Sequence, residues 1–231
     1  MARTLTALAL TPFTAASILA TAALLFTALT RYNAALPLLA GAALYSLLHF
    51  HRPGNRFFYV LAHELSHALA ALMSGVKIRK ISVRRNGGYV ALNSGSAFIS
   101  LAPYFIPFYA VAAGAAYAVA AFFADMSPFR PVFTGIAGFF LAFHVLNTGD
   151  VLAGPRQSDL TRAGGVFFSF AVVLLLNSLA LALALKLLFP ELVSLKGYAA
   201  SVWSNAGRIA DGAISAASYC ANVARIYLRK G

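Results

Sequence analysis

Cysteine, acidic residues and charge of any kind are scarce in this chain of 231 residues. Its one cysteine, Cys220, excludes an internal disulfide and a cluster of thiolates for a metal. Only 10% of the residues are charged, against about 25% in ordinary soluble domains. With 61% hydrophobic residues and a mean hydropathy of +0.78, a soluble globule of this size would expose too much apolar surface. The composition excludes soluble and disordered classes and predicts a polytopic membrane protein.

The charge that is present has mostly one sign. Eighteen Lys and Arg residues stand against six Asp and Glu residues, a net charge of +12. The cations lie mainly between apolar segments and near the carboxyl end, where such residues anchor helix ends and meet anionic lipid headgroups. We therefore expect the lipid bilayer as a partner and no binding of nucleic acid.

Six apolar runs come close to or exceed the length of about 20 residues that a helix needs to cross a bilayer. They are residues 5–29, 34–50, 57–74, 97–124, 131–147 and 164–189. The first run exceeds the ~7–15 apolar residues of a cleaved signal peptide, so we expect a retained helix. Pro103 and Pro107 predict a kink or a late start in the fourth run. The expected fold is an all-α polytopic membrane protein with about six transmembrane helices.

Two segments lie outside this helical pattern. Residues 77–92 contain β-branched positions followed by Asn86-Gly87-Gly88, which predicts a small β-hairpin with an Asn-Gly turn after the third run. Residues 192–231 are mildly apolar and carry five cations. We interpret this basic tail as an interfacial amphipathic helix in preference to a solvated tail.

The third run contains the sequence His63-Glu64-Leu65-Ser66-His67. Two histidines four residues apart lie on one face of a helix, so their imidazoles can converge on one metal ion. Glu64, next to the first ligand, is placed to take a proton from an attacking water molecule. Zinc would act as a Lewis acid and lower the pKa of that water towards about 7. Ionisable side chains in an apolar span are costly and usually mark function, so this pattern predicts a zinc hydrolase.

A catalytic zinc ion takes a third protein ligand and keeps one open position. Of the six carboxylates in the chain, Asp150 and Asp159 lie in the polar segment between the fifth and sixth runs. Asp150 could instead close the fifth helix through a turn, and Asp159 could cap the sixth helix. Both roles therefore stay open for each residue. His144, within the fifth run, is interpreted as a hydrogen-bonded intramembrane histidine rather than a ligand.

The stretch HELSHALAALMSG, a strand-like segment ending in Gly87-Gly88-Tyr89-Val90 and a late aspartate between apolar helices resemble the site-2 protease family. These proteins are intramembrane zinc metalloproteases, and the resemblance covers about residues 57–165. The family's third ligand is an aspartate in a Leu-Asp-Gly motif, from which both Asp150 and Asp159 depart. The Ser158-Asp159 pair resembles a compact, divergent branch of the family, so the resemblance favours Asp159 with Asp150 as the alternative.

The resemblance implies a Zn²⁺-dependent endopeptidase that hydrolyses peptide bonds in or near transmembrane segments, with a membrane-protein helix as its partner. Residues 1–191 would form the transmembrane metalloprotease-like domain, located in a bacterial inner membrane. The hairpin edge could accept an unwound substrate as an added strand, with Gly87 and Gly88 permitting its close approach. An ordinary flexible turn accounts for the two glycines equally well. Asn147 could be a side-chain donor to the substrate, but its interpretation as a polar helix-packing residue is preferred.

Two other functional classes fit the composition. A catalytically inactive, metal-binding scaffold could hold partner helices, but it has no physical need for the base Glu64. A transporter would also have several spans, but it usually has charged residues on several helices and a repeat of spans. The chain has few carboxylates and no visible repeat.

Overall fold

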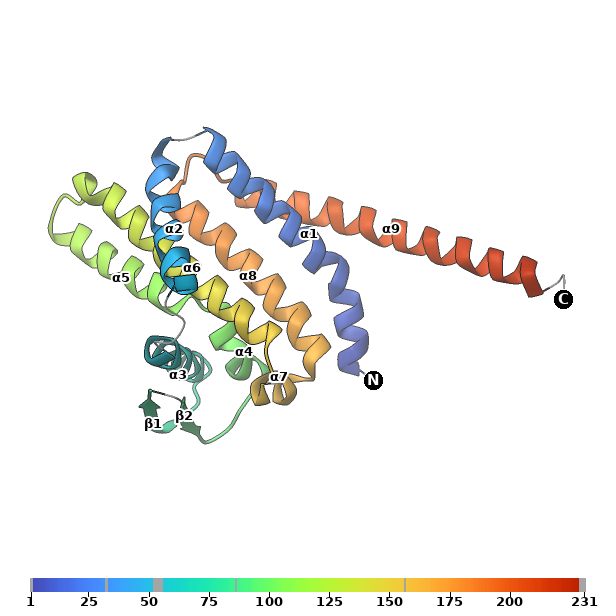
Figure 1. The fold of residues 1–231 in the computed structure, drawn as a ribbon, viewed down its shortest axis with the longest axis horizontal. Coiled ribbons are helices and arrows are strands. Elements are labelled where there is room, and N and C mark those ends of the chain that lie inside the picture. The colour runs from blue at the N-terminus through green and yellow to red at the C-terminus, as the bar shows by residue number, and fades with distance from the viewer. Residues whose placement is uncertain (1, 32, 52–55, 86, 156, 229–231) are drawn as a thin grey trace.

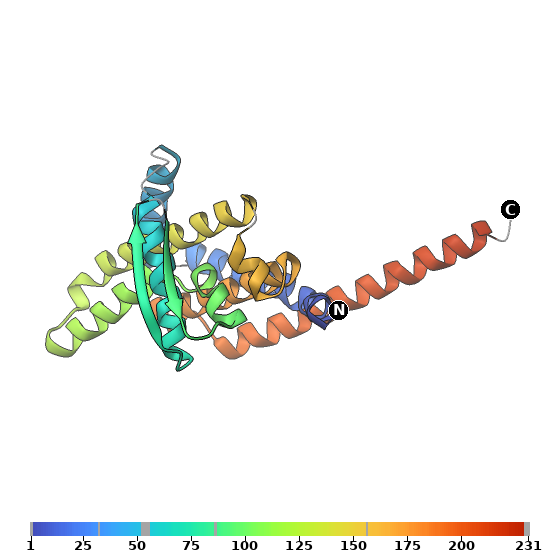
Figure 2. The ribbon, with the colours of Figure 1, turned by 90° about the horizontal axis from the view of Figure 1, so that it is seen from below.

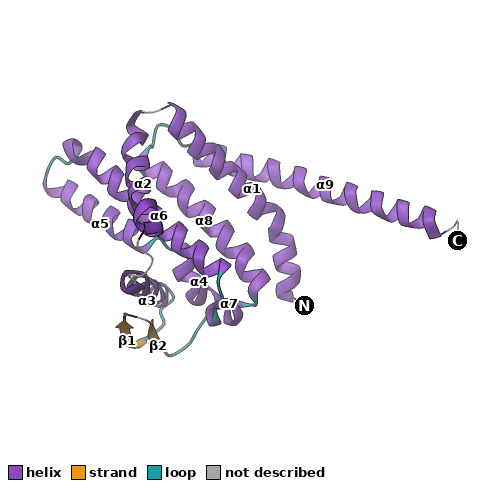
Figure 3. Ribbon diagram, viewed as in Figure 1, coloured by secondary structure: helices purple, strands orange, loops and turns teal. Residues whose placement is uncertain are grey.

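The computed structural model describes residues 2–31, 33–51, 56–85, 87–155 and 157–228. Helices dominate these residues, as expected, and one small hairpin accompanies them (Figures 1 and 3). The elements in chain order are α1 (Ala2–Arg31), η1 (Asn33–Ala35), α2 (Leu36–His51), α3 (Arg56–Met73), β1 (Ile78–Arg84), β2 (Gly87–Leu92), α4 (Ala97–Phe105), α5 (Phe108–Phe123), η2 (Ser127–Phe129), α6 (Arg130–Ala153), α7 (Ser158–Ala163), α8 (Val166–Leu188) and α9 (Leu195–Leu228).

The expected count of six membrane spans is too high for the described residues. Three helical segments are long and apolar enough to cross a membrane: Arg3–Thr30, Ser127–Ala153 and Val166–Leu188. The pair α4 and α5, bent by 76° at a short break, would add a fourth. At 1.5 Å per residue the 16 residues of α2 reach about 24 Å, less than the ~30 Å of the hydrocarbon core. The chain is a multi-pass membrane protein with three or four such spans.

Small and hydroxyl side chains join α1 to α8. The Thr14 hydroxyl donates to the carbonyl of Ala171 at 3.1 Å, and the Thr21 hydroxyl donates to the carbonyl of Ser178 at 3.1 Å. Both threonines are buried, as is Ser17 between them. Such contacts are typical of helix packing in a membrane, where apolar side chains gain little by leaving lipid.

The contact between α2 and α6 depends on glycine. A side-chain carbon at Gly41 would clash with the backbone of Gly135, and one at Gly138 would clash with the backbone of Leu38. The two backbones therefore approach as closely as two helices can. This contact places α2 along α6, and α6 also contributes residues to the candidate site.

The hairpin lies against α3, on the side visible at the lower edge of Figure 1 and in Figure 2. Its strands are antiparallel, with Ser82 opposite Tyr89 and Val83 opposite Gly88, which confirms the predicted hairpin. Asn86 of the predicted turn lies outside the described residues. On its other sides α3 contacts α4 and the start of α5. This helix, which carries the motif from His63 to His67, therefore lies between the hairpin and the bundle.

The short helix α7 is anchored between α4 and α8. Leu160 and Ala163 are buried against Leu101, Tyr104 and Val173. At the end of α7, Gly164 and Gly165 have φ values of 153° and 94°, which L side chains rarely adopt, and this lets the chain turn into α8.

The basic tail forms one long helix, α9. Near its start, buried Tyr198 meets the Thr21 hydroxyl at 3.1 Å and thereby joins α9 to α1. This packing continues through Val202 to the buried Ala206. Beyond Ala206 α9 extends away from the bundle, and most of its side chains are exposed (Figures 1 and 2).

Candidate metal centre

The helix α3 presents both motif histidines towards α4 and α7. His63 and His67 are one helical turn apart, and their Nε2 atoms lie 3.2 Å from each other. Both imidazoles are largely buried. The spacing read from the sequence therefore places two nitrogen ligands on one side of α3, as a shared metal ion requires.

Asp159, in the first turn of α7, is the carboxylate that the fold brings to these histidines. Its Oδ2 lies 3.3 Å from Nε2 of His63 and 3.6 Å from Nε2 of His67. In a tetrahedral zinc site with bonds of about 2.0–2.1 Å, neighbouring ligand atoms are about 3.3 Å apart. The three separations therefore match the edges of such a site, and the His, His, Asp donor set suits zinc.

Asp150, the alternative third ligand, lies elsewhere. The helix α6 continues through it to Ala153, so Asp150 does not close that helix through a turn. Its Oδ2 is 3.2 Å from Nε2 of His49 on α2, and its side chain is 66% exposed. Among the described residues, the group that could hold a metal is His63, His67 and Asp159. The geometry therefore favours Asp159.

The orientation of His67 depends on a proline in the neighbouring helix. Pro103 lies inside α4 and has no N–H, so it donates no hydrogen bond to the carbonyl of Ile99 one helical turn earlier. Nδ1 of His67 donates to this carbonyl at 2.8 Å. Because a carbonyl only accepts, Nδ1 of His67 carries the hydrogen and the lone pair of Nε2 faces the metal group.

Two tyrosines support the other ligands. The Tyr59 hydroxyl lies 3.3 Å from Nδ1 of His63, and the Tyr104 hydroxyl donates to Oδ2 of Asp159 at 3.2 Å. Burial raises the pKa of Asp159, but the hydrogen bonds and positive charge of His63 and His67 in their protonated forms outweigh it and hold that pKa below its usual range. Neither tyrosine was predicted from the sequence. Tyr59 could have been found from its spacing of four residues before His63, whereas Tyr104 has no such signal.

Glu64 lies on the side of α3 that the hairpin covers, and only 6% of it is exposed. A side-chain carbon at Gly88 would lie 2.7 Å from Cγ of Glu64 and 2.7 Å from the carbonyl of Ser82. Among the described residues, apart from its chain neighbours, no atom lies within 4 Å of such a carbon at Gly87. Gly88 therefore approaches Glu64 closely, and Gly87 does not.

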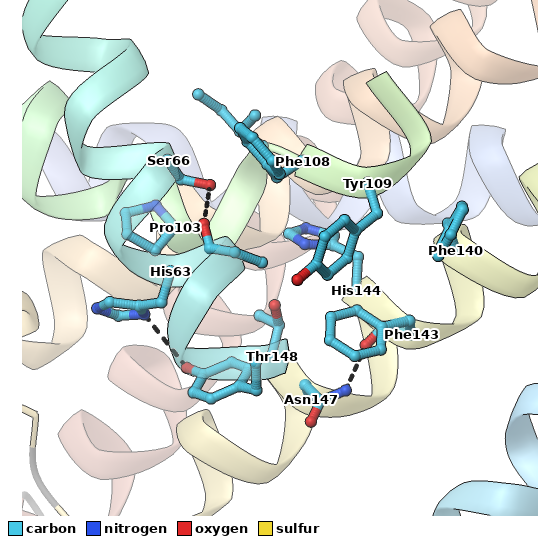
Figure 4. Close-up of a pocket in the computed structure, with 13 residues that line it drawn as sticks. His63, Ser66, Pro103, Phe108, Tyr109, Phe140, Phe143, His144, Asn147 and Thr148 are labelled. Carbon is cyan, nitrogen blue, oxygen red and sulfur yellow. Dashed lines mark hydrogen bonds between the residues drawn. The ribbon is translucent and has the colours of Figure 1, made fainter. Parts of the chain in front are cut away.

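A small cavity borders the metal group, between α3, the α4–α5 break and α6 (Figure 4). His63 lines it from α3, and His144, Asn147 and Thr148 line it from α6. The amide nitrogen of Asn147 donates to the Tyr45 hydroxyl at 2.6 Å and to the carbonyl of Phe143 at 2.7 Å. The amide hydrogens of Asn147 thus join α6 to α2, in keeping with the packing alternative.

The comparisons with known proteins point to a peptidase family. The family model described as Peptidase M50B-like matches residues 36–173, more than half of the chain. The match includes α3, the hairpin and α7, which together carry the metal group. Neither the curated proteins nor the solved structures gave a match.

The role of Pro103 generates a prediction about zinc affinity. Replacing Pro103 by Ala supplies an N–H that competes with His67 for the carbonyl of Ile99. Hydrogen-bond partners of metal-bound histidines typically contribute about 10–100-fold to metal affinity. Because the new N–H only competes with His67 for this carbonyl, we expect a smaller effect, a fall in zinc affinity of about threefold to tenfold. Competition with a chromophoric chelator measures this change.

The control is Pro12→Ala, which removes a proline from inside α1, a helix that contributes no ligand to the metal group. Its zinc affinity should equal that of the unaltered protein. Equal affinity in the Pro103→Ala variant would contradict the role assigned to the Ile99 carbonyl.

Proposed function

Because this chain belongs to the Peptidase M50B-like family, we propose that it is a zinc-dependent endopeptidase that cleaves membrane proteins in or near their transmembrane segments. The observation that carries the proposal is the convergence of His63, His67 and Asp159 on one point, with the buried Glu64 next to His63 on the same helix. A bacterial inner membrane is the location we propose.

The ligand atoms for zinc would be Nε2 of His63, Nε2 of His67 and Oδ2 of Asp159. When bound, zinc supplies a Lewis acid that polarises the scissile carbonyl and lowers the pKa of a water molecule. Nδ1 of His67, bonded to the carbonyl of Ile99, keeps its ring turned towards this point, and the Tyr104 hydroxyl holds Asp159 there.

Glu64 is the proposed general base. Its carboxylate takes a proton from the attacking water as the oxygen–carbon bond forms. The same carboxyl group then gives this proton to the departing amine nitrogen as the carbon–nitrogen bond breaks. Burial under the hairpin removes competing water, which strengthens the charge interactions of Glu64 within the site.

The proposed substrate is a membrane helix that unwinds locally, because a helical backbone keeps its carbonyls in hydrogen bonds. The two-stranded sheet has unpaired outer edges, which can bind an extended segment by strand addition. Since β2 passes beside Glu64 at Gly88, a segment added to the hairpin would lie near the proposed base. The substrate helix and the surrounding lipid are thus the proposed partners.

Replacement of Glu64 by Gln tests the reaction class. The amide keeps the shape of the side chain but cannot take a proton, so cleavage should fall by about 10²–10⁴-fold while zinc content stays the same. Cleavage is measured on single-span membrane proteins reconstituted with the full-length chain in lipid vesicles. Unchanged cleavage would remove Glu64 from the mechanism. Zinc binding without cleavage by the unaltered chain would favour the inactive scaffold.

The approach of Gly88 to Glu64 generates a prediction with a matched control one residue away. In the Gly88→Ala variant the new methyl group must displace Glu64 or the strand. Because a misplacement of about 1 Å can cost 10²-fold in rate, we expect cleavage to fall by at least about tenfold, with zinc content unchanged. The Gly87→Ala variant should cleave at the normal rate. Equal rates for the two variants would show that the Gly88 contact has no catalytic consequence.

A further inference from the structure

His144 is buried in α6, with 9% exposed, and lines the cavity that His63 borders (Figure 4). Its Nε2 lies 2.9 Å from Oδ1 of Asn177 on α8. The amide nitrogen of Asn177 donates to the carbonyls of Tyr104, at 2.6 Å, and Val173, at 2.9 Å, which fixes the orientation of the amide group. Oδ1 of Asn177 must therefore accept, and Nε2 of His144 must donate. The remaining nitrogen, Nδ1 of His144, carries a lone pair.

Thr148 lies one helical turn further along α6 and lines the same cavity, with 6% exposed. Neither its hydroxyl nor Nδ1 of His144 bonds to another group in the part of the chain that the structure describes. No fully buried side-chain polar atom there lacks a partner. These two atoms are therefore not fully enclosed by protein, and both residues line the cavity.

The remaining lining is neutral. Aromatic and apolar side chains predominate, and no carboxylate or Lys or Arg side chain lines the cavity. A charged ligand would find no opposite charge there. A peptide group has the matching polarity, with one N–H to donate and one carbonyl to accept, but the cavity of about 20 Å³ must widen to admit it. In a substrate helix that unwinds, both groups lose their partners and are costly to leave unpaired in an apolar setting.

We infer that His144 and Thr148 bind the backbone of the unwound substrate, His144 Nδ1 accepting from a peptide N–H and the Thr148 hydroxyl donating to a peptide carbonyl. Because His63 borders the same cavity, a backbone held there lies beside the metal group. This inference rests on the proposed function and adds to it a subsite that recognises peptide groups rather than side chains.

The test compares two inhibitors that share one zinc-binding group. Acetohydroxamate has the hydroxamate alone, whereas a leucine-containing peptide hydroxamate adds peptide groups. Their affinities are measured by calorimetry on the zinc-loaded, full-length protein in detergent. In the Thr148→Val variant, which keeps the side-chain shape, affinity for the peptide hydroxamate should fall by about threefold to tenfold, as expected for one lost hydrogen bond. Affinity for acetohydroxamate should not change.

Three further variants make the test specific. Thr148→Ser restores the hydroxyl and should restore affinity for the peptide hydroxamate. Thr134→Val removes a buried hydroxyl on the same helix that bonds to the carbonyl of Arg130, away from the cavity described above, and should leave both affinities unchanged. The His144→Phe variant should lose affinity for the peptide hydroxamate alone.

The outcomes separate this inference from the proposed function. If Thr148→Val weakens both inhibitors equally, or neither, the backbone subsite is wrong while the zinc peptidase stands. If neither inhibitor binds the unaltered protein in a zinc-dependent way, the metal site is wrong and the subsite fails with it.

Discussion

The need to keep ionisable side chains inside an apolar bundle constrains this molecule more than any other feature. Two imidazoles and the carboxylate of Asp159 lie together, with Glu64 buried close by. Such groups are expensive in a membrane protein unless they pair with one another or hold a cation. Their partners come from several elements, because the motif helix α3 cannot supply a third ligand by itself. The elements α4, α7 and the hairpin supply the contacts that α3 cannot provide for itself.

Backbone groups do much of this positioning. Pro103 leaves the carbonyl of Ile99 free for His67, and the absence of a side chain at Gly88 lets the hairpin cover Glu64. Pro103 lacks an N–H and Gly88 lacks a side chain. In each case the missing group makes room for a contact within the site. Substitutions at these two positions would thus alter the site without removing any ligand.

The local parts of the site could be predicted from the sequence. His63, Glu64 and His67 are set by helical spacing, and the hairpin is set by β-branched residues beside a glycine turn. Asp159 and Asp150 could not be separated in this way, because their distances from α3 depend on how α6 ends and where α7 packs. The resemblance to site-2 proteases favoured Asp159, and the fold places it 3.3 Å from His63. The span count was too high because α2 has only 16 residues, and because α3 is not among the helices long and apolar enough to cross a membrane.

The zinc content of the purified protein tests the central claim most directly. The account predicts about one zinc ion per chain, lost in the His67→Ala and Asp159→Ala variants and retained in Asp150→Ala. The last variant removes an exposed carboxylate that pairs with His49, so it controls for the loss of any aspartate. Zinc that persists without Asp159, or well-folded protein that binds no zinc, would contradict the account.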